Sequence, residues 1–152
     1  VSNVSMGLLS YNYDEKKDMF EFKRNKIIIP KNTKLPASKT IEVYPFKNSL
    51  KSEVFLKIGL TESRISETNP AFVNHVWYGK IILDSKHPLD LPVELICSYD
   101  VIGRMHLKII NPFTKNETAV TEIDIVKNSE DVIDLKLLGS KDYALLKNFL
   151  VE

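Results

Sequence analysis

The sequence is poor in the residue types that build catalytic, metal and phosphate sites. Among 152 residues there are one cysteine, three histidines and five glycines. The single cysteine, Cys97, excludes an internal disulfide and is typical of a reducing compartment. The histidines lie in separate segments, without the i, i+4 helical spacing or the paired cysteines of zinc sites. The scattered glycines form no phosphate-binding loop, so we expect no cofactor and no metal in this chain.

The sequence also lacks an excess of charge and a long apolar run. Its 21 basic and 20 acidic residues leave a net charge of +1. Such a balance lacks the excess of positive charge that is typical of proteins that bind nucleic acid or an anionic membrane surface. No apolar run approaches the roughly 18 residues that a membrane-spanning helix needs, and no signal peptide is visible. We therefore expect a cytoplasmic protein without nucleic-acid or membrane partners.

Signatures of catalysis are missing as well. There is no Gly-x-Ser-x-Gly elbow and no paired-carboxylate signature. Cys97 shares a strand face with Val93, Leu95 and Tyr99. That apolar setting predicts a buried, unreactive thiol rather than a nucleophile. We expect that the chain is not an enzyme.

What the sequence does contain is a series of short strands, with turn signals about every ten residues. Between Val54 and Leu60, apolar residues alternate with others at a period of two, which predicts one buried strand face. The segments before Asp100 and after Gly103 alternate in the same way and predict a hairpin. This rhythm predicts an antiparallel β-sandwich of about eight strands, in a domain of residues 1–128.

The first hairpin of that sandwich carries more aromatic residues than one buried face accommodates. Cross-strand aromatic pairing explains part of the set. The remainder is difficult to hide in a two-layer sandwich with one wet face, so we expect part of it to meet a partner. The residues concerned are Tyr11, Tyr13, Phe20 and Phe22.

The last segment, residues 129–152, changes in character. Ser129 followed by two acidic residues is typical of a helix N-cap, and Gly139 is placed as a C-cap. Ile133, Leu135 and Leu137 also alternate as they would in a strand, so both readings stand. Ser140 begins a second helical pattern with a broad apolar stripe. We predict one or two short C-terminal α-helices after the sandwich, as the possible start of a lid.

A family resemblance enters at residues Ile29–Pro36, which read Ile-Pro-Lys-Asn-Thr-Lys-Leu-Pro. This stretch is similar to the Ile-Pro-Arg-Asn-Thr-x-Ile-Pro motif in the peptide-binding domain of the seventy-kilodalton heat-shock (DnaK-type) chaperones. Further segments resemble that domain in the same order and at similar spacing: Ser5–Leu8, Gly79–Leu83, Pro92–Leu95 and the turn from Asp100 to Gly103. The chain is thus similar to a divergent member of that family.

The resemblance implies a chaperone domain that grips extended, apolar segments of unfolded polypeptides. It implies ATP only for a nucleotide-binding domain that this chain lacks, and co-chaperones only through a longer protein. Main-chain hydrogen bonds to such a peptide are sequence-independent, whereas a central pocket selects one apolar side chain. The peptide-binding residues that the resemblance implies are Leu8, Tyr11, Tyr44 (with Val43 as its alternative), Val54 and Leu56.

Departures from the family pattern leave two alternatives open. The first hairpin is longer than in the family, and the arch over the peptide would be built from Tyr11 and either Phe46 or Lys47, where the family has a methionine and a small apolar residue. One alternative is therefore a chaperone-fold docking module, whose cleft is filled by its own hairpin or lid and which binds one dedicated partner. The other is an unrelated β-sandwich binding module, such as an adhesion or carbohydrate module, because fold alone does not fix function.

Overall fold

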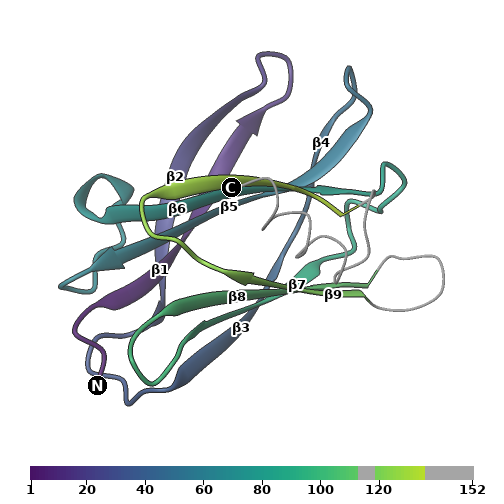
Figure 1. Cartoon of the computed structure of the whole chain (residues 1–152). Coiled ribbons are helices and arrows are strands. Elements are labelled where there is room, and N and C mark those ends of the chain that lie inside the picture. The colour runs from purple at the N-terminus through teal and green to yellow at the C-terminus, as the bar shows by residue number, and fades with distance from the viewer. Residues whose placement is uncertain (113–118, 136–152) are drawn as a thin grey trace.

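The computed structural model describes residues 1–112 and 119–135 and shows two β-sheets packed face to face (Figure 1). The predicted sandwich is confirmed, with ten strands in the described residues instead of about eight. Sheet A has the order β10-β6-β5-β1-β2, with β4 also pairing β5, and sheet B has the order β3-β7-β8-β9. The elements are β1 (Ser5–Asp14), β2 (Met19–Ile29), β3 (Ala37–Val43), β4 (Phe46–Asn48), β5 (Glu53–Ser63), the 3-10 turn η1 (Pro70–Phe72), β6 (Asn74–Leu83), β7 (Val93–Tyr99), β8 (Met105–Asn111), β9 (Ala119–Asp124) and β10 (Ser129–Asp134).

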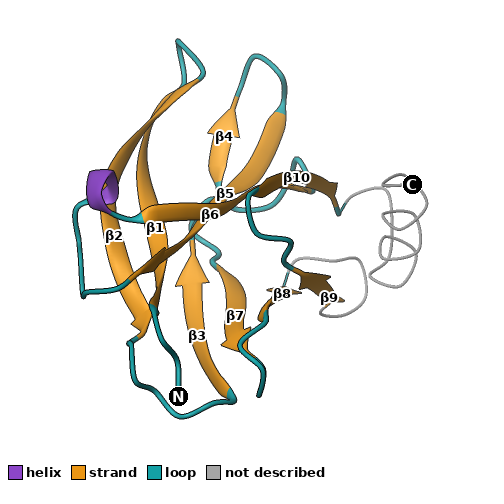
Figure 2. Cartoon of the chain, turned by 60° about the vertical axis from the view of Figure 1, so that its left-hand side comes forward, coloured by secondary structure: helices purple, strands orange, loops and turns teal. Residues whose placement is uncertain are grey.

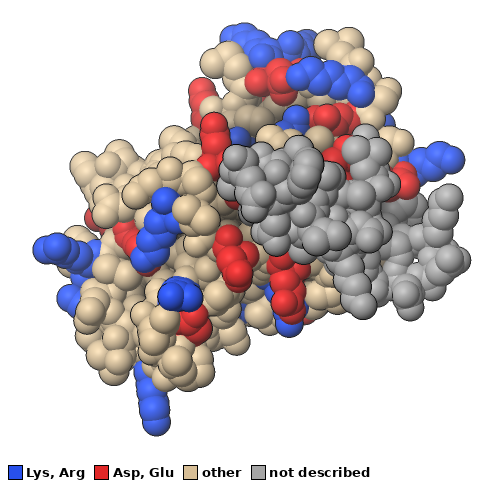
Figure 3. All heavy atoms as spheres, in the orientation of Figure 1, with Lys and Arg blue, Asp and Glu red and all other residues tan. Residues whose placement is uncertain are grey.

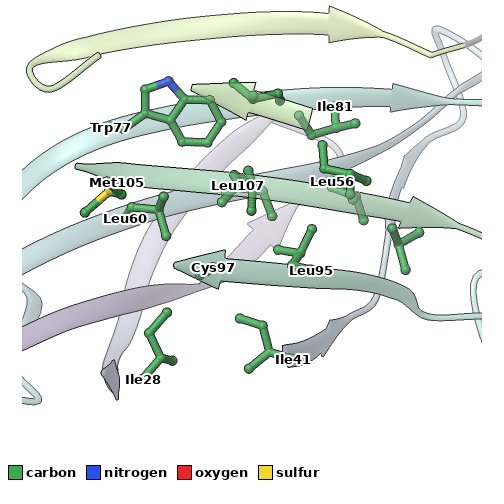
Figure 4. Packing of buried hydrophobic residues seen from close by; sticks show 14 of the residues in the cluster. Ile28, Ile41, Leu56, Leu60, Trp77, Ile81, Leu95, Cys97, Met105 and Leu107 are labelled. Carbon is green, nitrogen blue, oxygen red and sulfur yellow. The ribbon is translucent and has the colours of Figure 1, made fainter. Parts of the chain in front are cut away.

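The core lies between the two sheets and is built from alternate residues of each strand. From β5, the residues that point inward are Val54, Leu56, Ile58 and Leu60. Leu56 lies opposite Ile81 of β6 and belongs to the same buried cluster as Leu95 and Leu107 of sheet B (Figure 4). Cys97 is fully buried in the same cluster, and burial raises the pKa of its thiol to about 12. The predicted burial of Cys97 is therefore confirmed.

The predicted helix at Ser129 is wrong, because this segment forms strand β10. It pairs in parallel with β6, in a register from Ser129 opposite Trp77 to Asp134 opposite Ile82. Ile133 is fully buried in the core, whereas Val132 is 67% exposed, as the alternation of a strand requires. Pairing with β6 outweighs the local capping signal. Residues 129–134 thus belong to the sandwich, while Gly139 and the second predicted helix from Ser140 lie outside the described residues.

Sheet A divides into two hairpins at one end. Strands β1 and β5 pair only where Ser5–Leu8 lies against Leu60–Ser63. Beyond Leu8, β1 continues with β2 as one hairpin, and β5 continues with β4 as another. The two hairpins rise separately above the sandwich (Figure 2). We call the region between them, from Leu9–Asp14 on one side to Phe46–Gly59 on the other, the fork.

Candidate functional site

The five predicted site residues do not meet in one open pocket. Val54 and Leu56 are each 1% exposed and belong to the closed core, and Leu8 packs against that core from the inner face of β1. Tyr11 is buried on the outer face of sheet A, and Tyr44 is 58% exposed in the β3–β4 connection. Val43, the alternative to Tyr44, is half-buried against the core. A contact between these residues and a peptide therefore stays a prediction.

Strand geometry explains why the set separates. Leu8 and Tyr11 are three positions apart in one strand, so they point to opposite faces of sheet A. Leu8 lies opposite Leu60, which points into the core. Tyr11 instead fills the space above Gly59, where an added Cβ would collide with the Tyr11 hydroxyl oxygen.

The fork is filled by four aromatic rings, one from each of its strands, which we call the inter-hairpin cluster: Tyr13, Phe20, Phe46 and Phe55. Within the first hairpin, the rings of Tyr13 and Phe20 stack with centroids 4.5 Å apart. Across the fork, Tyr13 lies 5.6 Å from Phe46 and 5.7 Å from Phe55, and Phe20 lies 5.6 Å and 5.9 Å from the same two rings. Such pairs each contribute about 0.5–1.5 kcal/mol beyond the area they bury.

This cluster corrects the predicted arch. Tyr11 was expected to face Phe46 or Lys47, but it contacts Phe20 and Phe22 at centroid distances of 5.8 Å and 5.6 Å. The contact across the fork is made by Tyr13 and Phe20 instead. Phe55 was a missed residue, although its outward position in the alternating β5 pattern was a signal for it.

A second aromatic group continues from the fork along the outer face of sheet A, and we call it the outer aromatic face: Tyr11, Phe22, His75 and Tyr78. Phe22 is 49% exposed, lies 4.9 Å from the His75 ring and stacks at 6.5 Å on Tyr78. The Nε2 atom of His75 lies 2.7 Å from the carbonyl oxygen of Pro70. Because that carbonyl can only accept, Nε2 carries a hydrogen, and Nδ1 lies within hydrogen-bond distance of the Tyr78 hydroxyl.

The Tyr11 hydroxyl is buried and has no hydrogen-bond partner in the described part of the chain. Desolvation, and secondly the proximity of Tyr78, raise the pKa of Tyr11. A buried polar atom without a partner costs about 1–3 kcal/mol relative to a satisfied one. The hydroxyl is thus a donor left unused beside the fork.

Polar contacts join the tips of the two hairpins, and we call them the tip bridge. Lys51 Nζ lies 2.9 Å from Asp18 Oδ2, and the Ser49 amide donates to Glu15 Oε1 at 2.6 Å. The Tyr13 hydroxyl donates to Asp18 Oδ1 at 2.7 Å. The Lys51 hydrogen bond, followed by that from Tyr13, lowers the pKa of Asp18 to about 2. Basic and acidic side chains accordingly lie side by side over the tips (Figure 3).

Two lysines lie opposite each other on β5 and β6, beside the aromatic rings. Lys80 pairs with Glu53 at 2.5 Å. The Lys57 ammonium lies over the rings of Phe20 and Tyr78, 5.4 Å and 5.9 Å from their centroids. Burial lowers the pKa of Lys57.

Polar side chains elsewhere in the described residues contact one another. His106 lies between two carboxylates, with Nε2 2.8 Å from Asp100 Oδ2 and Nδ1 2.7 Å from Asp124 Oδ1. The buried Glu62 accepts from Tyr99 and pairs with Lys127 at 2.8 Å. Over residues 1–112 and 119–135, no group of histidine, cysteine and acidic residues is arranged to hold a metal ion. No helix in that part of the chain is long and apolar enough to cross a membrane.

Comparison with known proteins adds no assignment. No family model matches the chain, and no curated protein or solved structure matches it either. The resemblance to the heat-shock chaperones thus remains a prediction that rests on the sequence motifs.

Proposed function

We propose that this β-sandwich binds extended, apolar segments of polypeptide in the fork, as a chaperone-type domain without catalytic activity. One observation carries the proposal. Beyond Leu8, the side of β1 that faces β5 has no strand partner among the described residues, and neither does the facing side of β5 from Leu56 to Gly59. An open strand edge is a template for an extended peptide.

Such a site would combine two kinds of contact. Main-chain hydrogen bonds along Leu9–Asp14 would hold any extended segment, and the rings of the inter-hairpin cluster would enclose an apolar side chain. Burying a side chain of the size of leucine contributes roughly 1.5–3 kcal/mol. Micromolar affinity corresponds to about 8 kcal/mol, so both kinds of contact are required.

A second candidate is the self-occluded docking module, which is favoured by the inter-hairpin cluster. Phe55 is 1% exposed beneath Tyr13 and Phe20, so the chain's own rings occupy the fork. A peptide would then enter only after the two hairpins separate. In this version the wild-type domain serves one dedicated partner that opens the fork, rather than unfolded polypeptides in general.

The test is fluorescence anisotropy with a labelled leucine-rich heptapeptide, and with a serine-for-leucine peptide as control. We expect saturable binding of the leucine peptide alone, unaffected by ATP. A tip-bridge variant, Glu15→Gln/Asp18→Asn, separates the two candidates: binding by the variant but not by the wild type indicates self-occlusion. If neither protein binds up to high micromolar concentration while both melt cooperatively, the proposal is wrong.

We further propose that the domain works in the cytoplasm, where the buried thiol of Cys97 stays reduced. Co-chaperones and ATP would act through a nucleotide-binding domain in a longer protein. The alternative of an unrelated adhesion or carbohydrate module predicts no affinity for the leucine peptide, so the same titration tests it.

A further inference from the structure

Lys57 is a lysine whose charge is only partly compensated. Its side chain is half-buried on the outer face of sheet A, and its ammonium lies over the faces of Phe20 and Tyr78. Across residues 1–112 and 119–135, no carboxylate lies within ion-pair distance of its Nζ. Glu130 acts on it through space, which raises its pKa, but burial has the larger and opposite effect.

Three carboxylates near the fork already have other partners. Glu53 pairs with Lys80, Asp18 pairs with Lys51, and Glu15 accepts from the Ser49 amide. Lys57 itself lies directly opposite Lys80, a like charge on the neighbouring strand. Like charges placed opposite each other are unfavourable. An added negative charge on the outer face of sheet A would therefore be favourable beside Lys57 and Lys80.

We propose that Lys57 selects peptides with a carboxylate close to a large apolar side chain. This inference rests on the proposed function, because it assigns a substrate class to the fork. The apolar side chain would enter the inter-hairpin cluster beside Phe20, and the carboxylate of a neighbouring aspartate or glutamate would accept from Lys57. A hydrogen bond between charged groups at a partly desolvated position is stronger than one between neutral groups.

The experiment compares three heptapeptides that share a central leucine and differ at one neighbouring position, which is glutamate, glutamine or lysine. Anisotropy titrations use the wild type, Lys57→Met and Lys57→Arg, each also in the tip-bridge variant in case the closed fork prevents binding. Lys39→Met is the matched control, because Lys39 is an exposed lysine of β3 in sheet B, away from the fork, and lies opposite the core residue Cys97.

We expect the wild type to bind the glutamate peptide about tenfold more tightly than the glutamine peptide, and the lysine peptide least. In Lys57→Met the ratio should fall to within about twofold, whereas Lys57→Arg and Lys39→Met should keep it. The ratio should also shrink as salt is added.

Two results overturn the inference in distinguishable ways. If the glutamine and glutamate peptides bind equally, or if Lys57→Met keeps the tenfold ratio, Lys57 is not the selecting residue while peptide binding itself stands. If none of the three peptides binds any of the folded variants, the proposed function fails and the inference fails with it.

Discussion

The hydroxyls of Tyr11 and Tyr99 are both buried, but they differ in what they contact. The Tyr11 hydroxyl has no partner in the described part of the chain, whereas the Tyr99 hydroxyl donates to the buried carboxylate of Glu62. Removing an unpaired hydroxyl removes only an unfavourable group, but removing a partner leaves a buried charge less well satisfied. The two phenylalanine substitutions should therefore act in opposite directions.

We predict that Tyr11→Phe leaves the free energy of unfolding unchanged or raises it by up to about 1 kcal/mol, while Tyr99→Phe lowers it by about 1–3 kcal/mol. Urea denaturation of both variants, followed by the fluorescence of Trp77, measures this difference. A loss of stability in Tyr11→Phe as large as that in Tyr99→Phe would show that the Tyr11 hydroxyl has a partner in the folded protein.

His106 makes stability depend on pH. Both of its ring nitrogens face carboxylate oxygens, so both donate only when the ring is protonated. Asp100, and secondly Asp124, raise the pKa of His106 above its usual 6.5, and His106 in turn lowers the pKa of Asp100 below 3.8. A raised histidine pKa stabilises the fold below pH 6.5, and that contribution disappears as the pH rises through the folded-state pKa. The lowered Asp100 pKa stabilises above pH 3.8 and is lost in stronger acid.

We therefore predict that the difference in stability between the wild type and His106→Gln is largest between about pH 4 and pH 6.5, and shrinks above neutral pH. Melting temperatures measured for both proteins across pH 4–9 test it. A difference that stays constant, or grows, through this range contradicts the assignment of charge to His106.

At the scale of elements, the tip bridge holds two hairpins that share no backbone pairing beyond Leu8. Its charged groups are exposed, so it should contribute little to global stability. Locally it is the polar connection between the tips, because Asp18 and Glu15 reach across to Lys51 and the Ser49 amide. Loss of the tip bridge should therefore increase local opening of the hairpins while changing the midpoint of global unfolding little.

For Glu15→Gln/Asp18→Asn we predict faster amide hydrogen exchange in Leu9–Asp14, with little change in β7 and β8. Glu122→Gln is the control, because it breaks an exposed pair with Lys108 in sheet B at 3.3 Å. If exchange in Leu9–Asp14 is the same in wild type and variant, the inter-hairpin cluster alone keeps the fork closed.

The sequence predicted those elements whose burial pattern is local. In β5, the alternation from Val54 to Leu60 is enough to identify a strand and its inner face. The hairpin turn at Asp100 was equally visible, and the structure shows why: Asp100 Oδ1 accepts from the amides of Ile102 and Arg104, and Gly103 has a φ of 82°. Such signals lie within a few residues of one another and need no knowledge of the rest of the chain.

The fork could not be predicted in this way, because it depends on where β1 leaves β5, and their paired residues are more than fifty positions apart. The aromatic surplus in the first hairpin was visible in the sequence, but its partners Phe46 and Phe55 come from another hairpin. The separation of Leu8 from Tyr11 was predictable from their spacing, although the family resemblance had placed them in one site.

At the scale of the whole molecule, β10 completes the sandwich from the far end of the described chain. It is parallel to β6, whereas the other pairings in the described residues are antiparallel. The Trp77 indole nitrogen donates to Asp131 Oδ2 at 2.8 Å, and Ile133 is fully buried between the sheets. A strand places the side chains of the neighbours Val132 and Ile133 on opposite faces, whereas a helix does not. Substitutions at these two positions can therefore distinguish a strand from a helix.

In a strand, adjacent side chains point to opposite faces. We predict that Ile133→Ala lowers the free energy of unfolding by about 2–5 kcal/mol, because it opens a cavity in the core. Val132→Ala, one residue away on the exposed face, should change it by no more than about 0.5 kcal/mol. Urea denaturation, followed by the fluorescence of Trp77 on the neighbouring strand, measures both. Similar costs at the two positions would mean that β10 does not seal the core, and that residues 1–128 are the complete folding unit.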